Sequence, residues 1–200
     1  LMAPVVAFAH GMMTPVMSWG DSDMYKERNS PHFLGRYFPP EQPDRFFKQA
    51  TLKPEYATVY LDPRFRLPLY PMALGDCVVA THQWGFPSRK FCDQWKVVRL
   101  TELLYGVPPL EHVSTGTMDA WLSDFAPYYK VFSPLHRTVA GKAVTDFRCL
   151  TPDRMVQQTT FDSVARVTVN YGAAAWQDLA PLSAKIDYLK DGRQVRYTVN

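Results

Sequence analysis

The hydrophobic pattern of this chain changes near residues 134–141, and beyond that point it is the pattern of antiparallel β-structure. In residues 165–170 apolar and polar side chains alternate, which is the period of two that half-buried strands show. Residues 155–161 are rich in Val, Thr and Phe, as strands are. Asp162 and Ser163 lie between these segments, where a tight turn would join them. The sequence therefore predicts a β-hairpin here.

A second hairpin is predicted near the C-terminal end of the chain. Apolar residues recur at every second position in residues 186–188 and in residues 195–199. Between these segments lies Asp191-Gly192, a pair that readily adopts the backbone angles of a hairpin turn. Residues 139–200 are therefore expected to be antiparallel β, and a terminal hairpin can leave an exposed sheet edge for a partner.

Two amphipathic helices are predicted before this β-rich part. Asp93 can cap a helix that runs to about Tyr105, and Gly106 with the prolines after it ends that helix. Thr117 can cap a second helix. One face of the first helix carries Val97, Leu100, Leu103 and Leu104, and one face of the second carries Trp121, Phe125, Tyr128 and Phe132.

Short apolar segments alternate with these helices. Residues 4–9 and 110–113 are predicted as strands, and residues 72–80 fit either a strand or a short helix. Strands that alternate with helices are typical of α/β architecture. Because the first of these strands has the pattern of a buried one, we expect that a preceding segment of the natural protein is missing from the chain.

Charge and composition argue against several classes of protein. The net charge of +3 comes from 22 basic and 19 acidic residues spread along the chain, without the basic stripe that nucleic-acid binding needs. No run of about 18 apolar residues predicts a membrane span. Cys77, Cys92 and Cys149 lack metal-ligand spacing and are predicted to be buried free thiols. The sequence has no closely spaced His pair and no Gly-rich phosphate-binding loop, so it predicts neither a metal nor a nucleotide cofactor.

Several segments carry a joint signature in their order and spacing. They are RLPLY at 66–70, GDCVV at 75–79, ELLYGVPP at 102–109, CLTPDRMVQQTTF at 149–161 and VTVNYG at 167–172. Together they resemble the glycoside hydrolases related to the endo-alpha-N-acetylgalactosaminidases. The resemblance implies hydrolysis of O-glycosidic bonds in carbohydrates or glycoconjugates, with no cofactor.

The resemblance also implies a fold in two parts. Residues 1–138 would be the C-terminal portion of a (β/α)-barrel catalytic domain, and residues 139–200 an antiparallel β-sandwich packed on that barrel. The expected fold class is therefore α/β followed by all-β. In such barrels the reacting groups lie at the C-terminal ends of the strands, directly after the apolar segments.

Asp76 is the candidate catalytic residue under this interpretation. It is a carboxylate within an apolar segment, and a buried acid needs either a partner or a function. Hydrogen bonding to a neighbouring backbone group or Arg is the structural alternative. The residues expected to bind substrate are His10, His82, Trp84, Asp21 and Asp23. Trp84 would stack on a sugar ring, with ordinary core packing as its alternative, and a solvated loop surface is the alternative for the two aspartates.

Three departures from the family pattern bear on catalysis. In the family pattern a His precedes the Asp-Cys pair, an acidic residue precedes Gly-Met-Met, and an Asp follows Trp-Gly. This chain has Gly75, His10 and Phe86 at those three positions. Glycoside hydrolysis needs two carboxyl groups, and the resemblance places the main pair on earlier barrel strands outside this chain. The alternative function is therefore a non-catalytic carbohydrate-binding or structural fragment.

Overall fold

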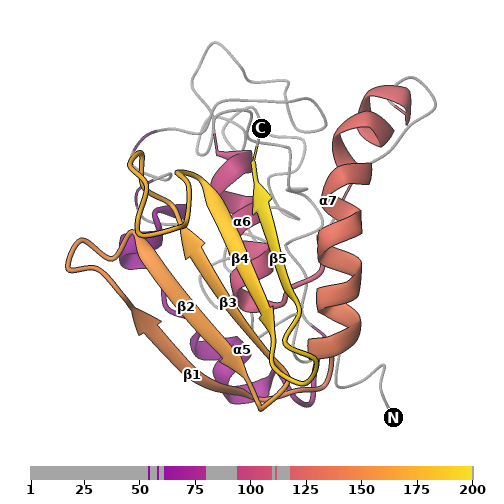
Figure 1. Cartoon of the computed structure of the whole chain (residues 1–200), viewed down its shortest axis with the longest axis vertical. Coiled ribbons are helices and arrows are strands. Elements are labelled where there is room, and N and C mark those ends of the chain that lie inside the picture. The colour runs from indigo at the N-terminus through magenta and orange to yellow at the C-terminus, as the bar shows by residue number, and fades with distance from the viewer. Residues whose placement is uncertain are drawn as a thin grey trace, which may run out of the picture.

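The computed structural model shows a five-stranded antiparallel sheet in the C-terminal part of the chain, with helices packed on one of its faces (Figure 1). The structure describes residues 54, 58, 61–79, 94–109, 111 and 118–199. The strands are β1 (Val144–Cys149), β2 (Val156–Phe161), β3 (Ala165–Asn170), β4 (Ser183–Tyr188) and β5 (Gln194–Thr198). Each strand pairs with the next, so the order in the sheet is the order in the chain. The predicted antiparallel β-structure is confirmed.

Both predicted hairpins are present. β2 pairs with β3 so that Phe161 lies opposite Ala165, and Asp162 in the turn between them has a positive φ of 43°. The turn between β4 and β5 contains Gly192, with a φ of 72°. Glycine adopts this left-handed conformation at little cost because it has no Cβ atom. The turn residues in the sequence therefore marked both hairpins correctly.

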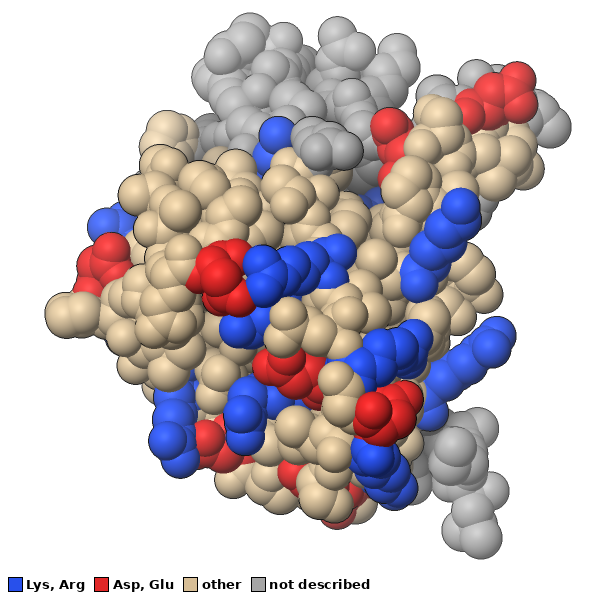
Figure 2. All heavy atoms as spheres, in the orientation of Figure 1, with Lys and Arg blue, Asp and Glu red and all other residues tan. Residues whose placement is uncertain are grey.

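The two faces of the sheet differ in polarity. The inner face carries buried aliphatic side chains, such as Val167 opposite Ile186. Figure 2 views the outer face and shows charges of both signs over the sheet. On this face Asp178, from the loop before β4, pairs with Arg196 and Lys185. A sheet with one apolar and one polar face packs against the hydrophobic core on its apolar face and meets solvent on the other.

The first predicted helix is confirmed. The described helical segments are η2 (Pro63–Phe65), α5 (Leu69–Leu74), α6 (Trp95–Tyr105) and α7 (Met118–Val139). The N-cap of α6 is Gln94, so the helix begins later than the predicted cap at Asp93, a residue outside the described part. α6 ends as predicted at Gly106, whose φ is 64° and whose N–H donates to the carbonyl of Leu103.

The second predicted helix, α7, is also confirmed. Tyr128 and Phe132 from the predicted apolar face are buried. The helix includes Pro127 and Pro134, so it continues well into the region where the hydrophobic pattern changes. Thr117, the predicted cap, lies outside the described residues.

The two long helices and the sheet share one hydrophobic core. Its fully buried members include Leu100, Leu103 and Leu104 of α6, Tyr128 and Leu135 of α7, and Val167, Val169 and Ile186 of the sheet. The core is therefore continuous across residue 139, where the two predicted domains meet. Within the described residues there is one sheet, and helices cover its inner face.

Other predicted features fall largely outside this part. The strand predicted at residues 4–9 lies outside the described residues, and of the strand at 110–113 only Glu111 is described, without regular structure. None of the helices in the described part is long and apolar enough to cross a membrane.

Candidate functional site

Asp76 lies in a turn that follows α5. The N–H of Cys77 donates to the carbonyl of Leu74 at 3.0 Å and closes this turn. The Asp76 side chain is exposed, and its Oδ1 accepts a hydrogen bond from the Cys77 thiol at 3.1 Å. Residues 72–74 are the end of α5, whereas residues 75–79 form a turn and irregular backbone, so the described part of this segment contains no strand. The expectation that Asp76 is a buried acid was therefore wrong, although its exposed carboxylate is accessible to a ligand.

The cysteines correct a second expectation. Cys77 and Cys149 are free, as predicted, but both are exposed, so the prediction of burial was wrong for them. Cys77 shares the exposed turn of Asp76, and Cys149 ends the edge strand β1. The hydrogen bond to the Asp76 carboxylate, together with its negative charge, raises the pKa of the Cys77 thiol. Cys92 lies outside the described residues.

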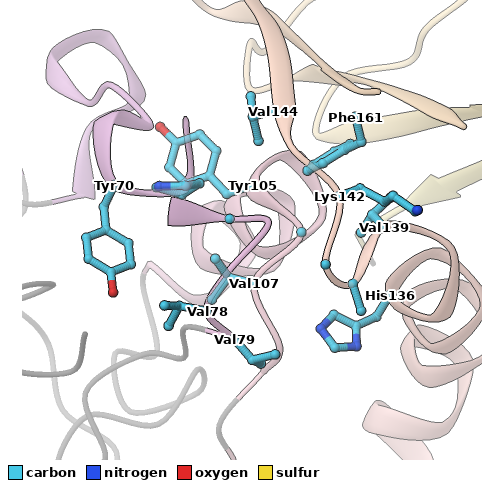
Figure 3. A pocket seen from close by; sticks show the side chains of 15 residues that line it. Tyr70, Val78, Val79, Tyr105, Val107, His136, Val139, Lys142, Val144 and Phe161 are labelled. Carbon is cyan, nitrogen blue, oxygen red and sulfur yellow. The ribbon is translucent and has the colours of Figure 1, made fainter. Parts of the chain in front are cut away.

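A small cavity lies beside the Asp76 turn (Figure 3). Side chains from the α5 turn, the ends of α6 and α7, and the first two strands surround it. Its lining includes Tyr70, Gly75, Val78, Val79, Tyr105, Val107, His136, Val139, Lys142, Val144 and Phe161. Its volume is about 30 Å³, which is room for water. Small-molecule sites measure about 300–1,000 Å³, so this cavity does not admit a sugar ring.

Three titratable groups at this cavity, His136, Tyr70 and Tyr105, are held in their neutral forms. Burial lowers the pKa of His136, whose ring stacks on Phe132 with the centroids 5.4 Å apart. Burial raises the pKa of both Tyr70 and Tyr105. At neutral pH the cavity therefore presents a neutral imidazole and two protonated phenols.

An ionic cluster is buried in the helical layer. The Arg99 guanidinium, 2% exposed, donates to the Glu102 carboxylate at 3.4 Å and also to Glu111. The Tyr128 hydroxyl donates to Glu102 at 2.8 Å. The rings of Tyr128 and Phe125 flank the guanidinium, with centroids 4.4 and 5.2 Å from its Cζ atom. We refer to Arg99, Glu102, Glu111 and Tyr128 as the Arg99 cluster.

The Arg99 cluster serves the fold. Burial works to lower the pKa of Arg99, but the charges of Glu102 and Glu111 outweigh it and raise that pKa. Burial, and then the charge of Glu102, raises the pKa of Tyr128 well above its usual value. Glu102 has no exposed surface, so a substrate does not reach its carboxylate. Sequence reasoning missed the cluster, although Arg99 and Glu102 have the three-residue spacing of a helical ion pair.

A larger groove lies between η2, the start of α6 and the turn that joins β1 to β2. Its lining residues are Thr58, Leu61, Asp62, Pro63, Arg64, Gln94, Val97, Asp153 and Met155. We refer to it as the η2 groove. Its volume of about 540 Å³ is in the range of small-molecule sites. It shares no lining residue with the cavity beside Asp76. None of its lining residues was among the predicted site residues, although Val97 lies on the predicted apolar face of α6.

Asp76 is the one predicted site residue that can be placed. The others, His10, Asp21, Asp23, His82 and Trp84, lie outside the described residues. Among the residues that the structure describes, no group of three or more His, Cys, Asp or Glu side chains is arranged to hold a metal ion.

Comparison with known families decides the class of protein. A family model described as glycosyl hydrolases related to the GH101 family, GH129, matches residues 1–160. The chain belongs to this family. The resemblance to glycoside hydrolases related to the endo-alpha-N-acetylgalactosaminidases, predicted from the five signature segments, is thereby confirmed. A search of curated proteins found no match to the chain.

Proposed function

We propose that this chain is part of an enzyme that hydrolyses O-glycosidic bonds in carbohydrates or glycoconjugates. The observation that carries this proposal is the match to the GH129 family over residues 1–160. Membership of a glycoside hydrolase family supports a glycosidase-like function and a carbohydrate substrate. The match spans the helical layer, β1 and all but the last residue of β2, so it covers half of the buried residues of the shared core.

For the fold, we propose that residues 1–138 form the last part of a (β/α) barrel and residues 139–200 the β-domain after it. In the described part this domain is a single sheet packed on helices and not the two-sheet sandwich that the sequence led us to expect. The succession of α6 and α7, followed by an antiparallel sheet, supports this division. Because helices and sheet share one core, the two parts would act as one body that holds the barrel end in place. The substrate would bind at the C-terminal ends of the barrel strands.

We propose Asp76 as one of the carboxyl groups of the active site. Glycoside hydrolysis passes through an oxocarbenium-like transition state between two carboxyl groups, one of which protonates the leaving oxygen while the other acts as nucleophile or base. Asp76 is supported by its exposure, because a reacting carboxylate has to reach the substrate. Its partner would come from the preceding part of the barrel.

The remaining predicted residues would bind the sugar around this carboxylate. Trp84 would stack on the apolar face of a sugar ring, as aromatic side chains commonly do. His82 would act beside it, and His10, Asp21 and Asp23 would contact sugar hydroxyls. These roles follow from the family resemblance and from the position of each residue after an apolar segment of the sequence.

The decisive experiment replaces Asp76 with Asn in the full-length natural protein. We expect hydrolysis of aryl glycosides to fall by about 10²-fold or more, because loss of a catalytic acid or base costs that much. Asp162→Asn is the matched control, since Asn tolerates the positive φ of this turn position and the residue lies between β2 and β3. If Asp76→Asn stays within a few-fold of the parent, Asp76 has no direct catalytic role.

The alternative function is non-catalytic carbohydrate binding or a structural role. The small cavity beside Asp76 favours this alternative, because the cavity has no room for a sugar ring. A full-length protein that binds carbohydrate without hydrolysing any aryl glycoside would support this alternative and contradict the proposed enzyme.

A further inference from the structure

The η2 groove has the mixed lining of a site for a polar small molecule. Asp62, Arg64, Gln94 and Asp153 supply hydrogen-bonding side chains, and Leu61, Pro63, Val97 and Met155 supply apolar surface. Such a combination of apolar walls and a few polar groups is typical of ligand pockets. The groove brings together segments that lie far apart in the sequence.

Buried hydrogen bonds hold the walls of the groove in place. Gln157 of β2 is fully buried, and its Nε2 donates to the carbonyls of Pro63 and Arg154, each at 2.8 Å. The Asp62 carboxylate caps η2 by accepting from the N–H of Arg64 at 2.9 Å. The wall on the η2 side is therefore tied directly to the sheet.

The turn between β1 and β2 is fixed in a similar way. The Asp153 carboxylate accepts hydrogen bonds from the Thr151 hydroxyl at 2.6 Å and from the N–H of Met155 at 3.1 Å. Both walls are thus formed before any ligand arrives, which reduces the entropy that binding has to overcome.

The charges in the groove define the ligand that it suits. The side-chain hydrogen bond from Arg64 lowers the pKa of Asp62, and the Thr151 hydroxyl lowers that of Asp153. Both carboxylates are therefore acceptors at neutral pH and do not act as acids. Arg64 is 53% exposed and keeps guanidinium N–H groups accessible as donors. Two carboxylates against one guanidinium disfavour an anionic ligand, and the combination of acceptors and donors suits a ligand with several hydroxyl groups.

We propose that the η2 groove is a non-catalytic binding site for a neutral saccharide, separate from the Asp76 turn. Asp153 accepts hydrogen bonds from sugar hydroxyls, and Asp62 holds Arg64 in place. Arg64 and Gln94 donate to sugar oxygens, and Val97 and Met155 contact the C–H face of the ring. The choice of a saccharide rests on the proposed glycosidase function. The groove itself rests on the geometry of η2, α6 and the β1–β2 turn.

Titration of the full-length protein with methyl glycosides of N-acetylgalactosamine, galactose and glucose tests this site by isothermal calorimetry. We expect Arg64→Gln to weaken binding of at least one of these sugars by tenfold or more. The matched control is Arg148→Gln, because Arg148 is also exposed and also pairs with an Asp two residues earlier, Asp146 on β1. Arg148 does not line the groove. We expect the control to bind within twofold of the parent, and both variants to keep the melting temperature of the parent.

Two outcomes overturn the site: no binding of any of the three sugars by the parent, or binding by Arg64→Gln within twofold of the parent. Hydrolysis of aryl glycosides by the parent is measured separately. Hydrolysis without Arg64-dependent binding supports the proposed enzyme and contradicts the saccharide site in the groove. Arg64-dependent binding without hydrolysis supports the groove and contradicts the enzyme.

Discussion

Arg99 and Arg64 form ion pairs in two regions of contrasting character. Arg99 is buried with Glu102 and Glu111 in the layer of α6 and α7, and aromatic rings flank it. Arg64 pairs with Asp62 at the rim of the η2 groove and is 53% exposed. In both regions a guanidinium meets carboxylates, but only at Arg64 does solvent reach the donors.

This difference decides what each arginine contributes. Removing one partner of a buried ion pair leaves an uncompensated charge in a medium of low polarity, so a buried pair is coupled tightly to folding. An exposed pair contributes about 0–1 kcal/mol, because water competes for both partners. The Arg99 cluster therefore links α6 to α7 within the helical layer, whereas the groove can use its polar groups for a ligand.

The largest expected effect is that of Arg99→Met. We expect a loss of about 3–5 kcal/mol in the free energy of unfolding, because Glu102 and Glu111 would lose their buried counter-charge. Arg64→Met is the matched comparison and should change stability by no more than about 0.5 kcal/mol. Urea unfolding followed by tryptophan fluorescence measures both. Equal losses of stability at the two positions would show that the buried ion pair is no more strongly coupled to folding than the exposed one.

Gly106→Ala tests the packing between α6 and the sheet. The new Cβ would lie 3.1 Å from both Phe161 and Val139, and the φ of 64° is unfavourable for Ala. We expect a loss of about 2–4 kcal/mol. Gly192→Ala has a similar φ but no atom within 4 Å, so it should cost about 1–2 kcal/mol. Thermal unfolding of both variants separates crowding from backbone strain, and identical losses would show that the contacts around Gly106 are loose.

The smallest expected effect is a dependence of stability on pH. Burial lowers the pKa of His136 in the folded state, so the unfolded chain binds its proton more readily. This contribution to stability is present above the unfolded pKa of about 6.5 and is lost as pH falls below it. The lowered pKa values of Asp62 and Asp153 act in the same direction but only below about pH 4. Melting temperatures between pH 7 and 5 should fall less for His136→Asn than for the parent, and parallel curves would contradict this assignment.

The elements found from sequence are those that depend on local signals. Alternating residues and turn residues at Asp162 and Gly192 marked the hairpins, and Gly106 marked the end of α6. β1 escaped prediction as a strand of its own, because a register shift between Val144 and Asp146 interrupts its alternation. Local pattern thus predicted most of the C-terminal part.

The site was predicted less well because its features depend on contacts between distant segments. Gln157 bonds to the carbonyl of Pro63, 94 residues away, and no sequence period marks such a contact. The burial expected for Asp76 failed because an apolar segment of this length fits a short helix followed by an exposed turn as well as it fits a strand. What sequence did supply was the family, through the signature segments.

The pairing of each strand with its neighbour in the chain has a consequence for how this part of the protein folds. Every β-pair joins strands that are consecutive in the chain, so the sheet can assemble pair by pair without a search for distant partners. α6 contacts β2, β3 and β4, and the full set of these contacts exists only once the three strands have met. We therefore expect the sheet to form early and to serve as the template on which the helices acquire their final packing.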